Sequence, residues 1–212
     1  MLHKLNRDYR IAFFLSLFTI IANLVEGSFS TILGQKDGTL ALFGFGLDSF
    51  IEVISAVGIT IMVLRIAREP DSPPSKFEVT ALKITGVSFY LLTAGLVVTA
   101  VLNLVTGAEP ETAISGLIIS LISLSVMVFL YRAKMSVGHR LNSDPIIADA
   151  NCTKTCIYMS LVLLGSSLIY TLTGFAFIDI IGALGLAWFS FSEGREAFEK
   201  AAGKMSCDTC SE

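Results

Sequence analysis

The segment that decides the fold is 39–64, TLALFGFGLDSFIEVISAVGITIMVL, in which only Asp48 and Glu52 are charged. About 20 apolar residues in a helix are enough to cross the hydrocarbon core of a bilayer. Charged side chains are costly at that depth and usually face the interior of a helix bundle or a water-filled path. The segment therefore predicts a membrane-spanning helix that carries a polar site.

The composition of the whole chain extends this prediction. Of its 212 residues, 53% are hydrophobic and 16% are charged, and the mean hydropathy is +0.73. Soluble domains are nearer about 25% charged. These values exclude a soluble globule, an intrinsically disordered chain, a coiled coil and a disulfide-rich secreted scaffold. The net charge of −3 also excludes a nucleic-acid-binding protein, which needs a basic face.

Five further segments have the length and apolar character of membrane spans. The expected limits of all six are 11–33, 39–64, 80–106, 113–131, 145–167 and 175–191. We therefore expect an all-α, multi-pass membrane protein of the cell (inner) membrane, embedded in the lipid bilayer. Its six transmembrane helices form one domain over residues 1–202, followed by a short cytoplasmic tail over 203–212. The last span is expected to continue as a polar helix over 192–200.

Lysine and arginine residues predict the orientation, because they are enriched in cytoplasmic loops. Twelve of the fifteen are assigned to one side, Lys36 alone to the other, and Lys83 and Lys154 to the spans. The twelve are Lys4, Arg7, Arg10, Arg65, Arg68, Lys76, Arg132, Lys134, Arg140, Arg195, Lys200 and Lys204. Both termini are therefore predicted to be cytoplasmic.

Acidic side chains dominate the charges inside the expected spans. Asp48 and Glu52 are four residues apart and share one helical face. Two carboxylates so close repel each other unless a cation or a proton lies between them, which favours a cation site. The alternative is a carboxylate pair neutralised by Lys83 or Lys154. Seven ionisable residues lie within the spans: Glu26, Asp48, Glu52, Lys83, Asp149, Lys154 and Asp179.

The fifth span adds thiols to this acidic interior. Asp149, Cys152 and Cys156 follow a spacing of three and then four residues, which again places them on one face. A single buried cysteine is often just a small hydrophobic residue, whereas two at helical spacing beside an aspartate favour metal ligation. With Asp48 and Glu52 they make a tetrahedral ligand set suited to Zn, Cd or Co and poorly suited to Mg, Ca or Mn. No organic cofactor is expected.

Two stretches resemble a known transporter family. Residues 42–55, LFGFGLDSFIEVIS, resemble the second helix of the cation diffusion facilitator family, and 148–156, ADANCTKTC, resemble its fifth. The resemblance implies six helices with cytoplasmic termini and a divalent metal bound between a four-apart pair on helix two and a His-x-x-x-Asp pair, or a variant, on helix five. It implies that Asp48 and Glu52 are the first pair and that Cys152 and Cys156 occupy the second.

The chain also departs from this family pattern. The Cys-x-x-x-Cys pair replaces His-x-x-x-Asp, so the usual metal preference does not carry over. The loop from Arg68 to Lys76 has no histidine. The chain ends soon after its last span, so it resembles a short branch without the cytoplasmic metal-binding domain, and a homodimer is an open expectation.

Several further residues are secondary candidates. Asn23 and Glu26 share a face of the first span and are candidates for the ion pathway. Asp149, which matches the aspartate that opens the helix-five motif, and Asp179 are candidates for a supporting position; hydrogen bonding to a neighbouring helix is the structural alternative for Asp179. In the tail, Cys207 and Cys210 form a lone Cys-x-x-Cys, a weak metal or redox candidate.

These features predict a secondary transporter that exports Zn, Cd or a similar divalent ion from the cytoplasm. Metal needs the deprotonated ligands, so binding releases protons and exchange of metal for protons follows. The alternative is a membrane zinc-binding or regulatory protein that does not transport. A third reading, a metal-activated hydrolytic enzyme, is not expected, because nothing marks a substrate pocket or a nucleophile.

Overall fold

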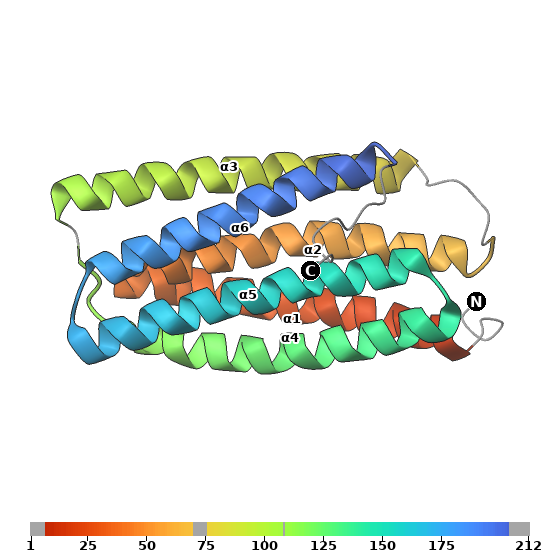
Figure 1. Ribbon diagram of the computed structural model, residues 1–212, viewed down its shortest axis with the longest axis horizontal. Helices are drawn as coiled ribbons and strands as arrows, with labels where there is room; N and C mark the ends of the chain where they lie inside the picture. Colours follow the sequence, from red (N-terminus) through yellow and green to blue (C-terminus); the bar gives the residue numbers. More distant parts are fainter. Residues whose placement is uncertain (1–6, 70–75, 108, 204–212) are drawn as a thin grey trace, which may run out of the picture.

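A computed structural model describes residues 7–69, 76–107 and 109–203 of the chain. These residues form six α-helices and no strand (Figure 1). The helices are α1 (Arg7–Asp37), α2 (Leu40–Ile66), α3 (Lys76–Thr106), α4 (Ile114–Leu141), α5 (Asp144–Thr173) and α6 (Phe177–Ala201). All six are long and apolar enough to cross a membrane, so the protein is a multi-pass integral membrane protein, as the sequence predicts.

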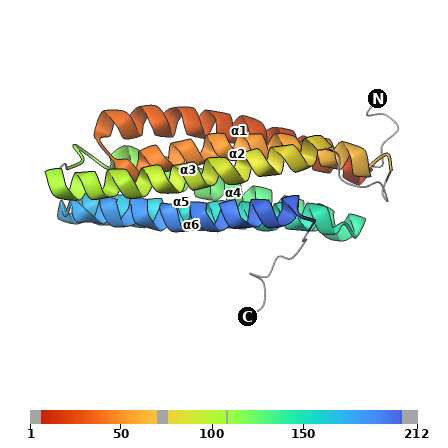
Figure 2. The same cartoon turned by 90° about the horizontal axis from the view of Figure 1, so that it is seen from above.

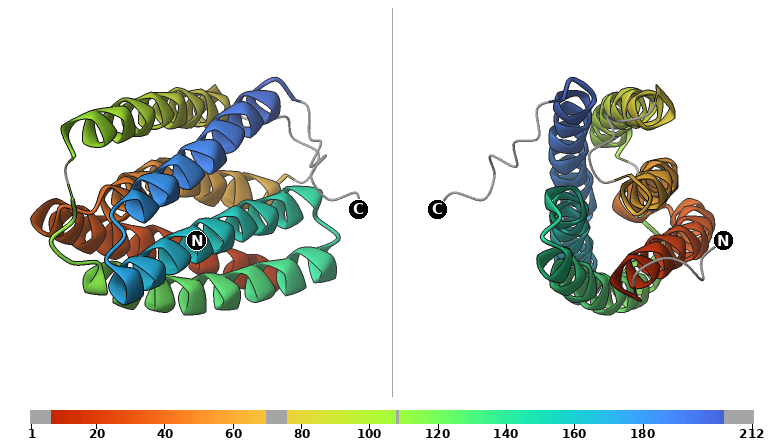
Figure 3. Two further views of the ribbon diagram at one scale, coloured as in Figure 1. Left: turned by 60° about the vertical axis from the view of Figure 1, so that its left-hand side comes forward. Right: turned by 90° about the vertical axis from the view of Figure 1, so that its right-hand side faces the viewer.

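The helices follow one another around a ring. Seen along the bundle, the order is α1, α2, α3, α6, α5 and α4, and each helix contacts the next (Figure 3, right). From above, α1, α2 and α3 lie in one layer and α5 and α6 in the other (Figure 2). α2 also contacts both α5 and α6 across the ring. The helices that carry the two family motifs therefore meet inside the bundle.

Successive helices run in opposite directions, which gives the bundle two distinct ends. α1 begins and α6 ends at the same end, on the right of Figure 1, which we name the terminal end. The other end, which we name the hairpin end, carries the connections between α1 and α2, between α3 and α4, and between α5 and α6. Cytoplasmic termini would place the terminal end in the cytoplasm.

Small and polar residues face the interior of the bundle, and large apolar residues face outward. The buried residues of α1 recur every three or four positions and are Ala12, Ser16, Thr19, Asn23, Gly27, Ser30, Gly34 and Asp37. On the outside, Ile32, Leu91 and Trp188 are 65%, 69% and 69% exposed. Lipid tails solvate such side chains, and membrane helices use small residues to approach one another closely.

Close helix approach depends on glycine at particular positions. A Cβ on Gly34 of α1 would lie 2.5 Å from the backbone nitrogen of Phe43 on α2, and one on Gly46 would lie 2.5 Å from Thr31 Oγ1. No side chain fits at such distances without a backbone shift. These two glycines therefore set the spacing between α1 and α2, which positions the acidic face of α2 against the interior.

The helices extend further at the terminal end than the sequence limits predict. α4 runs to Leu141 rather than to 131, and α6 continues to Ala201, as its polar extension indicates. The assignment of Lys134 to a cytoplasmic loop is therefore wrong. Lys134 lies on α4, is only 3% exposed and points into the bundle, because its ammonium group is paired there with a carboxylate.

Candidate metal site

A cavity of about 60 Å³ lies inside the bundle, between its middle and the terminal end. All six helices contribute to its wall, which combines charged groups and thiols with apolar side chains. The ionisable and thiol residues that line it are Glu52, Lys134, Asp149, Cys152, Cys156, Glu193 and Lys200. A volume of this size holds a few water molecules or a partly hydrated ion.

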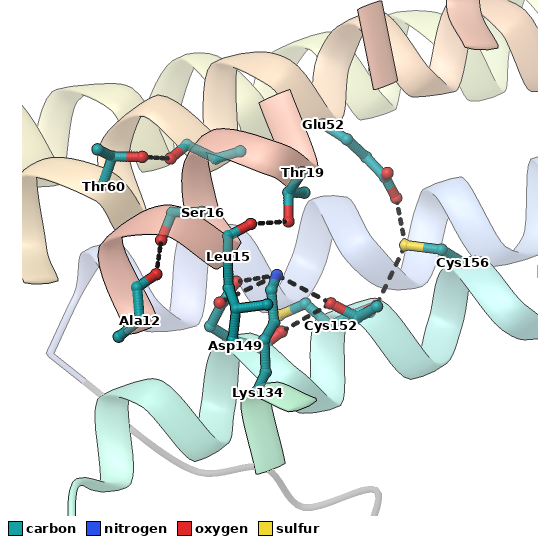
Figure 4. A network of polar contacts seen from close by, with 12 residues as sticks. Ala12, Leu15, Ser16, Thr19, Glu52, Thr60, Lys134, Asp149, Cys152 and Cys156 are labelled. Carbon is teal, nitrogen blue, oxygen red and sulfur yellow. Dashed lines mark hydrogen bonds and ion pairs between the residues drawn. The ribbon is translucent and has the colours of Figure 1, made fainter. Parts of the chain in front are cut away.

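One contact joins the two family motifs. The Cys156 thiol on α5 donates a hydrogen bond to Glu52 Oε1 on α2, with 2.6 Å between sulfur and oxygen (Figure 4). The other carboxylate oxygen of Glu52 accepts a 2.9 Å hydrogen bond from Asn23 Nδ2 on α1. Asn23 is fully buried, and its Oδ1 has no hydrogen-bond partner in the described part of the chain. Asn23 thus orients Glu52 and leaves a second oxygen beside it.

The other two predicted ligands lie on either side of this contact. α2 and α5 run in opposite directions, so Asp48 and Cys152 are each one helical turn from the Glu52–Cys156 pair, toward opposite ends of the bundle. Asp48 is 3% exposed, and Ser190 Oγ of α6 lies 3.5 Å from its Oδ1. Within the described ranges, no three His, Cys, Asp or Glu side chains are gathered closely enough to hold a metal ion.

Cys152 contacts the polar end of α6. Lys200 Nζ lies 2.7 Å from Cys152 Sγ and 2.7 Å from Glu196 Oε1. The sulfur is also 3.9 Å from Glu196 Oε1. Cys152 is therefore the thiol that lies beside a positively charged side chain.

Asp149 pairs with a lysine in the interior of the bundle. Lys134 Nζ lies 3.0 Å from Asp149 Oδ2 and 3.1 Å from Thr153 Oγ1, both on α5 (Figure 4). This ion pair is largely shielded from solvent. The lysines that the sequence offered as neutralising partners lie elsewhere: Lys83 is exposed, and Lys154 Nζ lies 5.9 Å from the centroid of the Tyr158 ring.

The remaining candidates lie apart from the Glu52–Cys156 contact. Glu26 of α1 accepts a 2.8 Å hydrogen bond from Ser49 of α2. Asp179, at the start of α6, accepts hydrogen bonds from the backbone N–H groups of Leu40 and Ala41, at 2.7 and 3.2 Å. It therefore caps the first turn of α2 at the hairpin end, which is the structural alternative stated for it. Cys207 and Cys210 lie outside the described residues.

Comparison with known proteins identifies the family. A family model described as the cation efflux transmembrane domain matches residues 13–205. The chain belongs to the cation efflux family. The resemblance drawn from 42–55 and 148–156 is thereby confirmed.

Curated relatives in the cation efflux family are similar over much of this chain. Magnetosome protein MamB of Magnetospirillum gryphiswaldense is 27% identical over 186 residues, which cover 85% of this chain and 62% of MamB. Manganese efflux system protein MneP of Bacillus subtilis is 29% identical over 151 residues, which cover 69% of this chain and 50% of MneP. An uncharacterized transporter of Methanocaldococcus jannaschii is 27% identical over 183 residues, 82% of this chain and 64% of that protein. The chain spans about half to two-thirds of the length of these relatives.

Four residues in or near the cavity lie beyond the predicted ends of the spans, so the sequence does not single them out as site residues: Lys134, Glu193, Glu196 and Lys200. Their signal is present in the sequence but subtle. Glu193, Glu196 and Lys200 are spaced three and then four apart, so they share one face of α6. The i, i+4 spacing of Glu196 and Lys200 is equally common on solvent-exposed helices, so the pattern alone does not identify a cavity-lining face.

Proposed function

We propose that the protein exports a divalent transition-metal ion from the cytoplasm in exchange for protons. The observation that carries the proposal is the Glu52–Cys156 contact, because it joins a carboxylate of α2 to a thiol of α5 at the wall of an interior cavity. Both groups are metal ligands when deprotonated, so binding of the ion displaces protons. Six helices around one such site allow it to be exposed to the two sides in turn.

Zinc geometry sets how far the two ligands must move. Typical Zn–S and Zn–O bonds of about 2.3 and 2.0–2.2 Å at a tetrahedral angle separate sulfur and oxygen by about 3.5 Å. The 2.6 Å between Cys156 Sγ and Glu52 Oε1 is shorter, so an ion enters by pushing them apart by about 1 Å. Asp48 and Cys152, each one turn away, are the proposed third and fourth ligands.

The two thiols favour Zn, Cd or Co as the substrate over Mn, since sulfur ligands select softer ions. A relative named for manganese efflux makes Mn the competing substrate. The Lys and Arg bias supports export: with the termini in the cytoplasm, the cavity lies on the cytoplasmic side of the Glu52–Cys156 contact, the side from which an exporter takes its ion.

The test is metal flux in proteoliposomes carrying a pH gradient, measured separately for Zn, Cd, Co, Mn and Fe. Zn and Cd are expected to move faster than Mn. Glu52→Gln and Cys156→Ser are each expected to lower zinc flux at least about tenfold, because loss of a residue that merely supports a metal ligand already costs about that much. Asp8→Asn is a matched control, because Asp8 forms an exposed ion pair with Arg140 outside the cavity. Unchanged zinc flux in both ligand variants would contradict the proposed site.

The second candidate is a membrane zinc-binding protein that does not transport. The same Glu52–Cys156 contact favours it, since an ion held there would brace α2 against α5. Saturable, pH-gradient-driven flux supports the transporter. Stoichiometric binding without flux supports the bracing role.

A further inference from the structure

We propose that Lys200 competes with the transported ion for Cys152. Its ammonium group contacts the sulfur of Cys152 and is displaced from it by ions that bind sulfur strongly. The inference rests on the proposed function, in which Cys152 is a metal ligand. It adds a residue outside both family motifs that sets which ions the site accepts.

The contact between these two residues is specific. Lys200 Nζ lies 2.7 Å from Cys152 Sγ, although the two residues are on different helices and 48 positions apart in the chain. Both line the interior cavity. A lysine ammonium has three N–H donors and no acceptor, so it interacts with the sulfur as a cation, through the same lone pairs that a metal ion would use. The position proposed for the metal at Cys152 is thus held by a positive charge that belongs to the protein.

Glu196 allows this charge to withdraw. It lies one turn before Lys200 on α6, and its Oε1 is 2.7 Å from the lysine Nζ. When an ion bonds to Cys152, the ammonium group loses the sulfur but keeps both its proton and its partner carboxylate. A proton carried by the thiol leaves to cavity water as the metal–sulfur bond forms. The exchange therefore costs one contact and leaves Lys200 paired with Glu196.

The competition discriminates among ions because its outcome depends on how strongly each ion binds the sulfur of Cys152. A divalent ion that enters the cavity is repelled by the ammonium group until that group moves. Zn and Cd gain a strong bond to sulfur when it moves, whereas Mn and Mg prefer oxygen and gain little. Lys134 provides the internal comparison: its ammonium group is held by Asp149 and Thr153, so its charge is directed at oxygen atoms.

The test is a double-mutant cycle on metal binding by the full chain in detergent. Every protein carries Cys207→Ser and Cys210→Ser, so that tail thiols do not bind the probe. Cd binding is followed by calorimetry and by the cadmium–thiolate charge-transfer absorption, which reports bonds to sulfur directly. Lys200→Gln is measured with Cys152 present and with Cys152→Ser. Such a cycle isolates the interaction between two residues in contact.

With Cys152 present, Lys200→Gln is expected to tighten Cd binding about tenfold, the size of a typical coupling between contacting residues. In the Cys152→Ser protein the gain is expected to fall below about threefold. Mn binding is expected to change equally with and without Cys152. Lys200→Arg keeps the cation and is expected to resemble the parent. Lys154→Gln removes the same charge beside Tyr158 and is the matched control.

Two results would overturn the inference. Weaker Cd binding by Lys200→Gln would show that the lysine supports the site, and an equal gain in both backgrounds would reduce it to a general charge effect. If Lys200→Gln does not fold because Glu196 is left unpaired, the pair Lys200→Gln/Glu196→Gln removes both charges and gives the same comparison. If the Lys200–Cys152 cycle shows the expected coupling but the protein gives no zinc flux, only the proposed transport is rejected. If zinc flux occurs but the cycle shows no coupling, only the proposed competition is rejected.

Discussion

Acidic residues have different partners at the two ends of the bundle. At the hairpin end, Asp179 binds the backbone N–H groups that begin α2, and Asp37 accepts a short hydrogen bond from Ser115 of α4. Thr39 Oγ1 also donates to the carbonyl of Thr112 at 3.0 Å. In the terminal half, Glu52, Asp149 and Glu193 line a cavity together with lysines and thiols.

The acidic residues of the two ends therefore differ in what they can do. At the hairpin end, Asp179 binds backbone N–H groups and Asp37 binds a serine hydroxyl, so these carboxylates tie neighbouring helices together. Carboxylates that share a cavity with ammonium groups and thiols can exchange one cation for another. Acidic residues therefore join helices at the hairpin end and line a cavity in the terminal half, and four substitutions test this contrast.

The largest effect is expected at the buried ion pair of the terminal half. Asp149→Asn leaves the ammonium group of Lys134 buried without its countercharge, which is expected to cost about 3–5 kcal/mol in the free energy of unfolding. Thermal unfolding of the purified protein measures the loss. Because the penalty comes from the unpaired charge, Asp149→Asn/Lys134→Met should recover most of it. A double variant as unstable as the single one would mean that the pair is not what holds α4 to α5.

At the hairpin end, Asp179→Ala removes both acceptors of the α2 cap. Hydrogen bonds to a charged group contribute about 1.5–3 kcal/mol each, and we expect a total loss of about 3 kcal/mol. Asp179→Asn keeps one acceptor oxygen and should lose about half as much. Metal binding in the terminal half is expected to be unchanged in both, as measured by calorimetry. A matched loss of metal affinity would show that the two ends are not independent.

Packing at the hairpin end gives the third prediction. Gly34→Ala places a Cβ 2.5 Å from the backbone nitrogen of Phe43, and overpacking of this kind costs about 1–3 kcal/mol. Gly95→Ala is the matched control, because nothing lies within 4 Å of the Cβ it would add. The difference in unfolding temperature between the two variants is the measurement. Equal unfolding temperatures would contradict a close approach of α1 and α2.

The sequence predicts the number, order and approximate positions of the helices, because each is a long apolar run that meets the length requirement of a bilayer. It fails at the terminal end, where a hydropathy window of about 20 residues stops at Arg132 and Lys134 although the helix continues to Leu141. Hydropathy treats a buried, paired lysine as a loop residue, because the carboxylate that pairs with it comes from another helix.

The candidate site shows the same limit. Four-residue spacing correctly predicts that Asp48 and Glu52 share a face, and likewise Cys152 and Cys156. It does not predict how far α2 is shifted along α5, and this shift decides that Glu52 meets Cys156 while Cys152 meets Lys200. The shift depends on packing between helices that are far apart in the sequence, which no local pattern contains.

The smallest effect is expected at Asn23, the residue that holds Glu52 in place. Asn23→Ala removes the 2.9 Å hydrogen bond to Glu52 Oε2 while leaving the Glu52–Cys156 contact. Residues that orient a metal ligand typically change affinity by about tenfold or more when removed, and we expect zinc affinity to fall about tenfold with little change in unfolding temperature. Asn23→Asp keeps an oxygen beside Glu52 but adds a second carboxylate, so it cannot donate the lost bond. If Asn23→Asp binds zinc more tightly than Asn23→Ala, the unpartnered Oδ1 of Asn23 contributes to the ion as an oxygen ligand, and if both bind equally weakly, its role is to orient Glu52.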